Sequence, residues 1–263
     1  MQSGLPKISP DRHDFSIVHT FGDTIDAKGL PDSFSVYDNR PIPNQNNLDD
    51  RFTPPLIPIP YGCTAESLTF DAGIQDGKLF NPVAFYLAIP PRVMGVGRDI
   101  RDALKTAINT GFQSPDGTTG AKRTAYFNCY GVGAIDDFDA ARIGLWINQN
   151  EKRSVIVGTY WYWGEYPETY IPVPSFDTSK ASLHCYLITG WSGDYLEIIP
   201  WLGEDSGNKG RFYLSREIYN KLMAQPWTGA FTITKTEGIT PIPIGYQAII
   251  DHLIYFIRQL FHL

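Results

Sequence analysis

Residues 58–67, PIPYGCTAES, place a cysteine directly after a proline-rich run and at the start of a segment that suits a helix. The chain has only three cysteines, so the position of Cys63 needs a physical reason. A nucleophilic thiolate needs a lowered pKa, a nearby base and stabilisation of the oxyanion that it creates. A cysteine in the first turn of a helix gains the lowered pKa from the helix N-terminus.

A histidine on a facing strand would supply the base. His184 lies far along the chain from Cys63, in the apolar segment SLHCYLITGW (182–191), which suits a strand. Cys63 and His184 are therefore a candidate dyad. The structural alternative stays open, because cysteine is often a small buried hydrophobe and a strand histidine usually has a packing role. Cys185 is expected in the core, since neighbouring strand residues point to opposite faces.

The composition is that of a globular chain with many turns. The 263 residues are 43% hydrophobic and 19% charged, and the 20 prolines and 24 glycines favour turns over a helical bundle. A net charge of −6 without a Lys/Arg run argues against a nucleic-acid partner. Three widely spaced cysteines fit neither a disulfide framework nor a zinc site, so no metal and no cofactor are expected.

Neither end of the chain resembles a membrane-targeting segment. The opening MQSGLPKISPDRHDF lacks the apolar core of a signal peptide. The apolar C-terminal segment contains Asp251, His252 and Arg258 and is too polar to span a bilayer. We therefore expect a cytoplasmic protein, or one assembled in the cytoplasm into a particle such as a virion.

Helical segments come mostly first and strand-like segments later. Helices are expected at 63–74, 80–89, 97–111 and 136–150, and strands at 153–163, 182–193, 194–201, 209–215 and 229–236. This segregation indicates an α+β fold rather than alternating βαβ units. Residues 1–41 are expected to form an extended N-terminal arm, with one strand at DFSIVHTF (14–21).

Residues 237–263 are expected to form a linker and an amphipathic helix. On a helical wheel, Ile249, Leu253, Phe256 and Leu260 of YQAIIDHLIYFIRQLFHL (246–263) share one line, with polar residues opposite. Such a helix either packs on its own domain or docks on a protein partner, which includes a second copy of the chain.

Several segments, in order, match the motifs of one known family. LDDRFTPPL (48–56) is similar to the lead-in Asp-Leu-Arg-x-x-x-Pro-Pro-Val, and YGCTAES (61–67) to Gly-Ser-Cys-Thr/Trp-Ala. GRDIRDALKTAINTGF (97–112), SLHCYLITGW (182–191) and PWLGEDSGNKGRF (200–212) are similar to later motifs. In these segments the chain resembles the papain-like cysteine peptidases, especially their bacterial and phage-type members. The resemblance implies a papain-like domain over 42–236, with a helical left lobe and a β-barrel-like right lobe. It also implies that Cys63 and His184 face each other as nucleophile and general base, across a cleft that binds a peptide.

The resemblance fails at two positions that carry chemistry. Six residues before the nucleophile, the family has a glutamine that donates to the oxyanion, and this chain has Ile57. The nearest upstream glutamine is Gln45. The asparagine that orients the family's histidine aligns with Pro200, whose side chain has no hydrogen-bonding group.

The residues around the third position also differ from the family. Two tryptophans that flank the asparagine correspond to Leu202 and Ser206. Glu197 or Asp194 is an alternative partner for the histidine, although strand alternation from Pro200 does not favour Glu197.

These departures predict a catalytically impaired papain-like protein, a pseudoenzyme that serves as a structural or binding component of a larger assembly such as a phage virion. Losing one oxyanion donor costs about 10²–10³ in rate, and losing the orienting residue of a triad costs a further factor. The alternative is an active cysteine peptidase that uses Cys63 and His184.

Three further segments offer weaker hypotheses. Gly95 and Gly97 precede a helix as in a phosphate loop, but the rest of that motif is missing. Asp136, Asp137 and Asp139 fit the start of a helix better than a calcium site. The aromatic run TYWYWGEY (159–166) suits ligand stacking, or a strand at the rim of a cleft.

Overall fold

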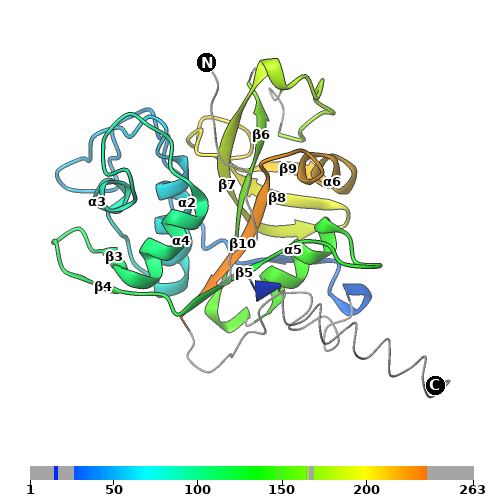
Figure 1. Cartoon of the computed structure of the whole chain (residues 1–263), viewed down its shortest axis with the longest axis horizontal. Coiled ribbons are helices and arrows are strands. Elements are labelled where there is room, and N and C mark those ends of the chain that lie inside the picture. The colour runs from blue at the N-terminus through cyan, green and yellow to red at the C-terminus, as the bar shows by residue number, and fades with distance from the viewer. Residues whose placement is uncertain (1–14, 17–26, 148, 164, 166–168, 236–263) are drawn as a thin grey trace.

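The computed structural model describes residues 15–16, 27–147, 149–163, 165 and 169–235. The helices nearer the N-terminus gather on one side of the molecule, and the main sheet lies on the other side together with the later helices (Figure 1). The helical lobe contains α2 (Cys63–Asp76), α3 (Pro82–Ala88), α4 (Ile100–Asn109) and the hairpin of β3 (Phe112–Gln113) and β4 (Thr119–Ala121). The predicted C-terminal helix lies outside the described residues.

The sheet lobe is built from strands far apart in the sequence. Its strands are β1 (Phe15–Ser16), β2 (Ser33–Ser35), β5 (Ala125–Asn128), β6 (Val155–Tyr162), β7 (Ala181–Ser192), β8 (Tyr195–Ile199), β9 (Phe212–Ser215) and β10 (Gly229–Thr234). They run in the order β1-β5-β10-β6-β7-β8-β9, and β2 pairs with β7. All these pairs are antiparallel except β1 with β5.

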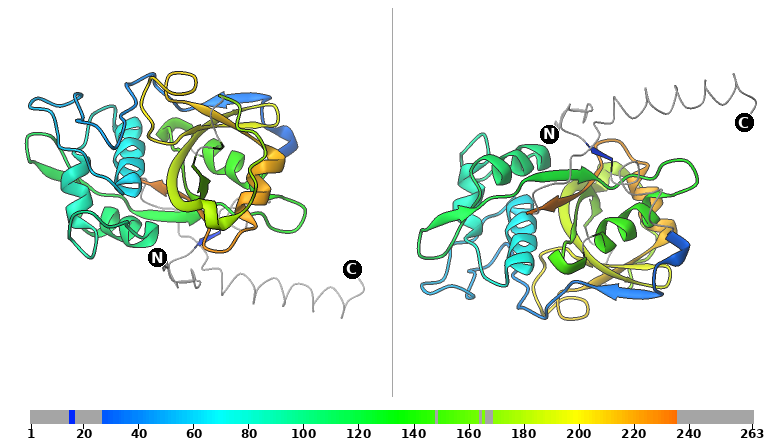
Figure 2. Two further views of the ribbon diagram at one scale, coloured as in Figure 1. Left: turned by 90° about the horizontal axis from the view of Figure 1, so that it is seen from above. Right: turned by 90° about the horizontal axis from the view of Figure 1, so that it is seen from below.

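The sheet curls without closing. Figure 2 shows its strands wrapping around α5 (Asp137–Trp146). Within the described chain β1 and β9 stand at the two ends of the strand order and do not pair with each other, so the lobe is an open curled sheet and not a closed barrel. The remaining elements are α6 (Arg216–Met223) and the short 3₁₀ turns η1 (Ala27–Gly29), η2 (Gln149–Glu151) and η3 (Thr178–Lys180).

Helix α2 lies between the two lobes. It packs against α3 and α4 on one side and against β6 and β7 on the other. Every residue from Thr64 to Gln75 is buried, as expected for a helix enclosed on all sides. Gly77 ends the helix in the left-handed conformation that glycine adopts readily.

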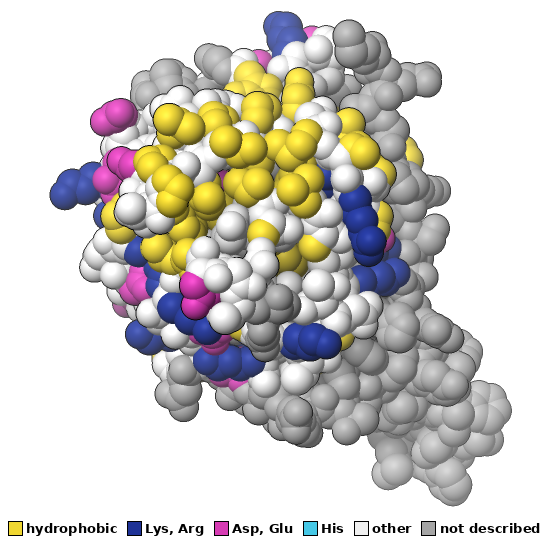
Figure 3. All heavy atoms as spheres, turned by 90° about the vertical axis from the view of Figure 1, so that its left-hand side faces the viewer, with side chains coloured by type: hydrophobic (Ala, Val, Ile, Leu, Met, Phe, Trp, Pro, Cys, Tyr) yellow, Lys and Arg dark blue, Asp and Glu magenta, His cyan; other side chains and the backbone are white. Residues whose placement is uncertain are grey.

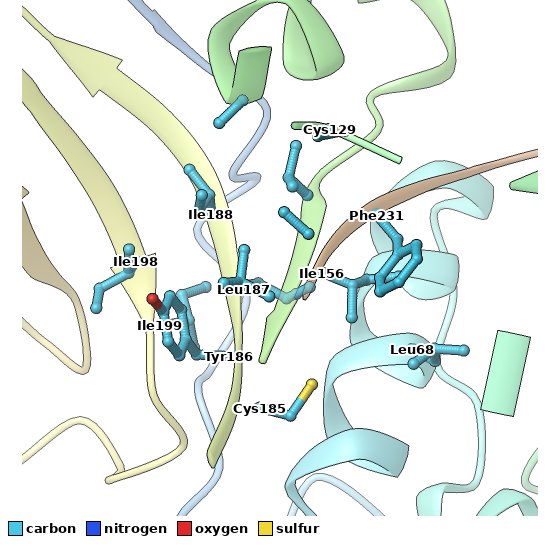
Figure 4. Close-up of a cluster of buried hydrophobic side chains, with 14 of the residues drawn as sticks. Leu68, Cys129, Ile156, Cys185, Tyr186, Leu187, Ile188, Ile198, Ile199 and Phe231 are labelled. Carbon is cyan, nitrogen blue, oxygen red and sulfur yellow. The ribbon is translucent and has the colours of Figure 1, made fainter. Parts of the chain in front are cut away.

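Strands β6 and β7 carry the core of the sheet lobe. Their central residues form nearly continuous buried runs, which explains why the sequence there is apolar rather than alternating. Figure 4 shows part of this core, in which Leu187, Ile156 and Phe231 meet beside Leu68 of α2. The core is therefore continuous from the sheet to the helix that carries Cys63.

Polar caps explain where the other helices begin. Asn81 caps α3 ahead of Pro82, Asp99 caps α4, Asp136 caps α5 and Ser215 caps α6. The Asp99 carboxylate accepts the N–H groups of Arg101 and Asp102, so a side chain fills the position that a phosphate-loop hypothesis would need.

Arginines neutralise the acidic start of α5. Asp136 ion-pairs with Arg216, and Asp139 with both Arg142 and Arg216. The helix-start interpretation is therefore correct. No group of ligands suited to a metal ion occurs among the described residues.

Candidate active site

Cys63 is the first residue of α2, as the sequence predicts. Gly62 is the N-cap, and no side chain caps the helix. The residue as a whole is half-buried, and its sulfur accepts a hydrogen bond from the N–H of Cys185 on β7, at 3.4 Å. The thiol is thus held against the strand at the residue next to His184.

His184 lies on β7, an inner strand of the sheet lobe. It pairs with Thr159 of β6 and is 4% exposed. Its Nε2 lies 2.9 Å from the carbonyl oxygen of Pro200. A carbonyl can only accept, so Nε2 carries the proton and Nδ1 is left as the basic nitrogen. The ring therefore has a fixed tautomer, although Pro200 has no polar side chain.

Two tryptophans enclose the histidine ring: Trp161 on β6 and Trp163 directly after the end of this strand. The ring centres of Trp161 and Trp163 lie 5.4 and 5.3 Å from that of His184. The indole N–H of Trp163 donates to Ser182 Oγ at 2.5 Å, which fixes the outer ring. The aromatic run thus covers the ring of His184, and its rim-of-the-cleft interpretation stays a prediction.

Burial leaves both members of the pair uncharged at neutral pH. It raises the pKa of the Cys63 thiol, and the N–H groups of Cys185 and Thr64 oppose this only in part. Burial also lowers the pKa of His184 to about 4, against a smaller opposite effect of the Pro200 carbonyl. The expectation that the helix N-terminus lowers the thiol pKa is therefore wrong for the resting protein, because desolvation outweighs it. No hydrogen bond joins the two side chains, both of which the structure describes.

The two alternative partners of the histidine are engaged elsewhere. Glu197 accepts hydrogen bonds from Thr189 and Ser35 and ion-pairs with Arg211. Asp194 ion-pairs with Arg216. The carbonyl of Pro200, which side-chain reasoning could not detect, takes their place.

Ile57 and Gln45 occupy very different environments. The side chain of Ile57 is 56% exposed and offers no donor. Gln45 is 7% exposed, and its Oε1 is buried without a hydrogen-bond partner in the described chain. The Gln45 N–H donates to the carbonyl of Trp201 and its carbonyl accepts from Ile59, both at 3.2 Å. Gln45 therefore lies between the loop that leads to Cys63 and the segment that follows Pro200.

Cys185 is buried, as expected, at 2% exposure. In Figure 4 its sulfur points from β7 toward α2. The strand thus directs its two consecutive residues differently, with Cys185 toward the helix and His184 toward Trp161 and Trp163.

Apolar side chains gather on the outer face of the helical lobe (Figure 3). The exposed large hydrophobic residues of this lobe and its loops are Leu48, Ile57, Tyr61, Leu87, Val93, Met94 and Val96. Arg98 fixes one of these loops by donating to the carbonyls of Val93 and Val96. No helix in the described part of the chain is long and apolar enough to cross a membrane.

Comparison with known proteins identifies the fold. No family model and no curated protein matches the chain. Xylellain, a cysteine protease from Xylella fastidiosa, matches with 17% identity and a TM-score of 0.60, over 89% of this chain and 95% of that one. The cysteine protease CMS1MS2 of Carica candamarcensis matches with 14% identity and a TM-score of 0.55, over 79% of this chain and 100% of that one. Digestive procathepsin L 3 of Tenebrio molitor matches with 11% identity and a TM-score of 0.59, over 86% and 75% of the two chains.

The chain therefore has the papain-like fold, in which a helical lobe and an antiparallel sheet lobe lie side by side. The α+β fold class expected from the sequence is confirmed, with an open sheet in place of a barrel.

Proposed function

We propose that this protein is a papain-like cysteine peptidase in which Cys63 is the nucleophile and His184 the general base. The observation that carries the proposal is the hydrogen bond from His184 Nε2 to the Pro200 carbonyl. It supplies the orientation that the missing asparagine gives in the resemblance, and it leaves Nδ1 free to take a proton. The position of the Cys63 sulfur, hydrogen-bonded beside His184, supports the same roles.

The reaction starts from a neutral thiol and a neutral imidazole. His184 Nδ1 takes the thiol proton as the sulfur attacks the peptide carbonyl carbon. The Nε2–H group meanwhile keeps its hydrogen bond to the carbonyl oxygen of Pro200. The resulting imidazolium gives its proton to the leaving amine, and an acyl group remains on Cys63. A water molecule, deprotonated by the same nitrogen, then hydrolyses this thioester and restores the thiol.

Gln45 is our candidate for the second oxyanion donor, beside the N–H of Cys63. Its side chain is buried, and its backbone is tied to Ile59 and Trp201 on the two sides of the site. Asp38 and Arg40 offer a second Asp-x-Arg lead-in upstream of Gln45. Arg40 binds Asp38 and the carbonyl of Gly73 in α2. If Asp38 and Arg40 are aligned with the family's Asp-Leu-Arg lead-in, Gln45 takes the place of the family's glutamine. The segment between this glutamine and Cys63 is then longer than in the family.

The pseudoenzyme prediction rested on two missing side chains. A backbone carbonyl replaces one of them and Gln45 is a candidate for the other, so the active alternative is the one we favour. The bacterial or phage-type subgroup, a role in a virion and docking through the segment 237–263 stay predictions from the sequence, as does a cytoplasmic location.

Alkylation of Cys63 tests the proposal directly. Purified protein is treated with a thiol-directed inhibitor of papain-type enzymes, and labelling is followed by mass spectrometry at each cysteine. We expect rapid labelling of Cys63 at neutral pH, with Cys129 and Cys185 protected by burial. His184→Ala should slow labelling by at least about tenfold, because the general base is lost.

The controls separate catalysis from simple exposure. Cys63→Ser should abolish labelling at this position. Iodoacetamide is then applied to folded wild type and to folded His184→Ala, and the extent of its reaction with Cys63 shows whether the sulfur stays accessible in the variant. Slow labelling that does not depend on His184 would refute the peptidase assignment and restore the inert structural module.

A further inference from the structure

Trp201 has a backbone conformation that few large residues adopt. Its φ is 61°, in the left-handed region, and the residue is completely buried. A residue without glycine's freedom pays on the order of 1–3 kcal/mol for such a conformation, so the surroundings must hold it there. The strain lies directly after Pro200, at the carbonyl that binds His184.

The φ of Trp201 sets the direction of that carbonyl. The peptide unit between Pro200 and Trp201 is planar, so its carbonyl turns only with ψ of the first residue and φ of the second. Relaxation of Trp201 to an ordinary negative φ would rotate the oxygen away from His184 Nε2 or displace the chain that follows. The hydrogen bond of 2.9 Å therefore depends on the backbone conformation of the residue after Pro200.

Three elements of the site hold Trp201 in place. Its indole N–H donates to Ser67 Oγ on α2 and to the carbonyl of Cys185 on β7, both at 3.0 Å. Its ring packs edge-on against Phe70 of α2, with centres 5.2 Å apart. Its carbonyl accepts the N–H of Gln45. Trp201 is thus bonded to the helix of Cys63, to the strand of His184 and to the candidate oxyanion residue.

We infer that Trp201 is the positioning residue of this site: by holding a left-handed turn it aims the Pro200 carbonyl at His184 in place of an orienting side chain. Its catalytic consequence rests on the proposed function, while its effect on the histidine tautomer does not.

Trp201→Phe tests the inference, with Trp191→Phe as its matched control. Both changes remove the N–H of a buried tryptophan, and Trp191, on the same strand as His184, donates only to the carbonyl of Pro31. The readout is the ¹⁵N NMR spectrum of the His184 ring at pH 7. Wild type and Trp191→Phe should show the Nε2–H tautomer alone. Trp201→Phe should show a mixture with the Nδ1–H form, and His184-dependent labelling of Cys63 should fall at least about tenfold.

Ser67→Ala is the milder perturbation, because it removes one of the two acceptors of the indole and leaves the backbone intact. We expect a smaller change of tautomer in the same direction. An unchanged Nε2–H tautomer in Trp201→Phe and in Ser67→Ala would refute the inference and reduce Trp201 to a packing residue. If wild type itself shows no His184-dependent labelling, the peptidase assignment fails while the tautomer still tests Trp201.

Discussion

The charge on Glu66 should govern how the stability of this protein changes with pH. Glu66 lies in the first turn of α2, three residues after Cys63, and is 2% exposed. Burial raises its pKa from an ordinary value of 4.5 to about 7, although Arg51 opposes this from 3.6 Å. Its Oε2 has no hydrogen-bond partner in the described chain, so little compensates the cost of ionising it.

The sign of the effect follows from proton binding. Between pH 4.5 and about 7 the native state holds a proton on Glu66 that the unfolded chain has lost. The free energy of unfolding therefore falls as the pH rises through this range and stays low above it. A pKa rise from 4.5 to about 7 corresponds to about 3 kcal/mol in the free energy of unfolding, at about 1.4 kcal/mol for each pKa unit. Glu66→Gln removes this titration while it keeps the size of the side chain.

The measurement is urea unfolding of wild type and Glu66→Gln at several pH values from 4 to 8. The variant should gain about 3 kcal/mol relative to wild type between the two ends of this range. Only this difference is informative, because buried His184 drives stability the opposite way, upward from about pH 4 to 6.5, in both proteins. Glu217→Gln, in an exposed pair with Lys221, is the control and should show no such gain. A stability difference between variant and wild type that stays constant with pH would refute a buried, proton-holding Glu66.

Two further predictions concern catalysis. Gln45→Ala should lower kcat about 10²–10³-fold with little change in KM, as expected for loss of an oxyanion donor. Gln113→Ala, in the remote β3–β4 hairpin, is the control and should leave kcat unchanged. The measurement is the steady-state kinetics of peptide hydrolysis. Labelling of Cys63 by iodoacetamide in a His184→Ala background should keep rising beyond pH 9, because burial raises the thiol pKa above its ordinary 9.0. A rate that levels off near pH 7 would contradict a neutral resting thiol.

The sequence predicts the elements that carry the candidate dyad better than the residues around it. The small residues after Cys63 and the apolar run around His184 are strong local patterns, and α2 and β7 lie within a few residues of where they predict them. Helix α6 was not predicted. It has only eight residues and begins directly after β9, so the strand-like pattern of 209–215 runs into it without a separating turn. Strand β2 falls within the segment expected to be an arm, and its pairing with β7 depends on tertiary contact.

The support of the site escaped prediction for a more general reason. Alignment compares side chains, whereas His184 is oriented by a main-chain oxygen that every residue type at position 200 would possess. What sets the direction of this oxygen is the left-handed φ of Trp201, which a tryptophan in the sequence does not indicate. Gln45, the nearest upstream glutamine, does not fit the family's fixed spacing to Cys63, yet loop length is the least constrained feature of a fold.

The exchange of an asparagine side chain for a backbone carbonyl changes where the site is vulnerable. Both groups are neutral acceptors for Nε2–H, so neither adds a charge that would stabilise the imidazolium. Desolvation then dominates, and His184 and Cys63 rest as a neutral pair. A side-chain acceptor is lost through mutation of one residue, whereas the carbonyl of Pro200 persists through any substitution that leaves its peptide unit in place. The sensitive position therefore moves to Trp201, whose indole hydrogen bonds to Ser67 and Cys185 hold that peptide unit.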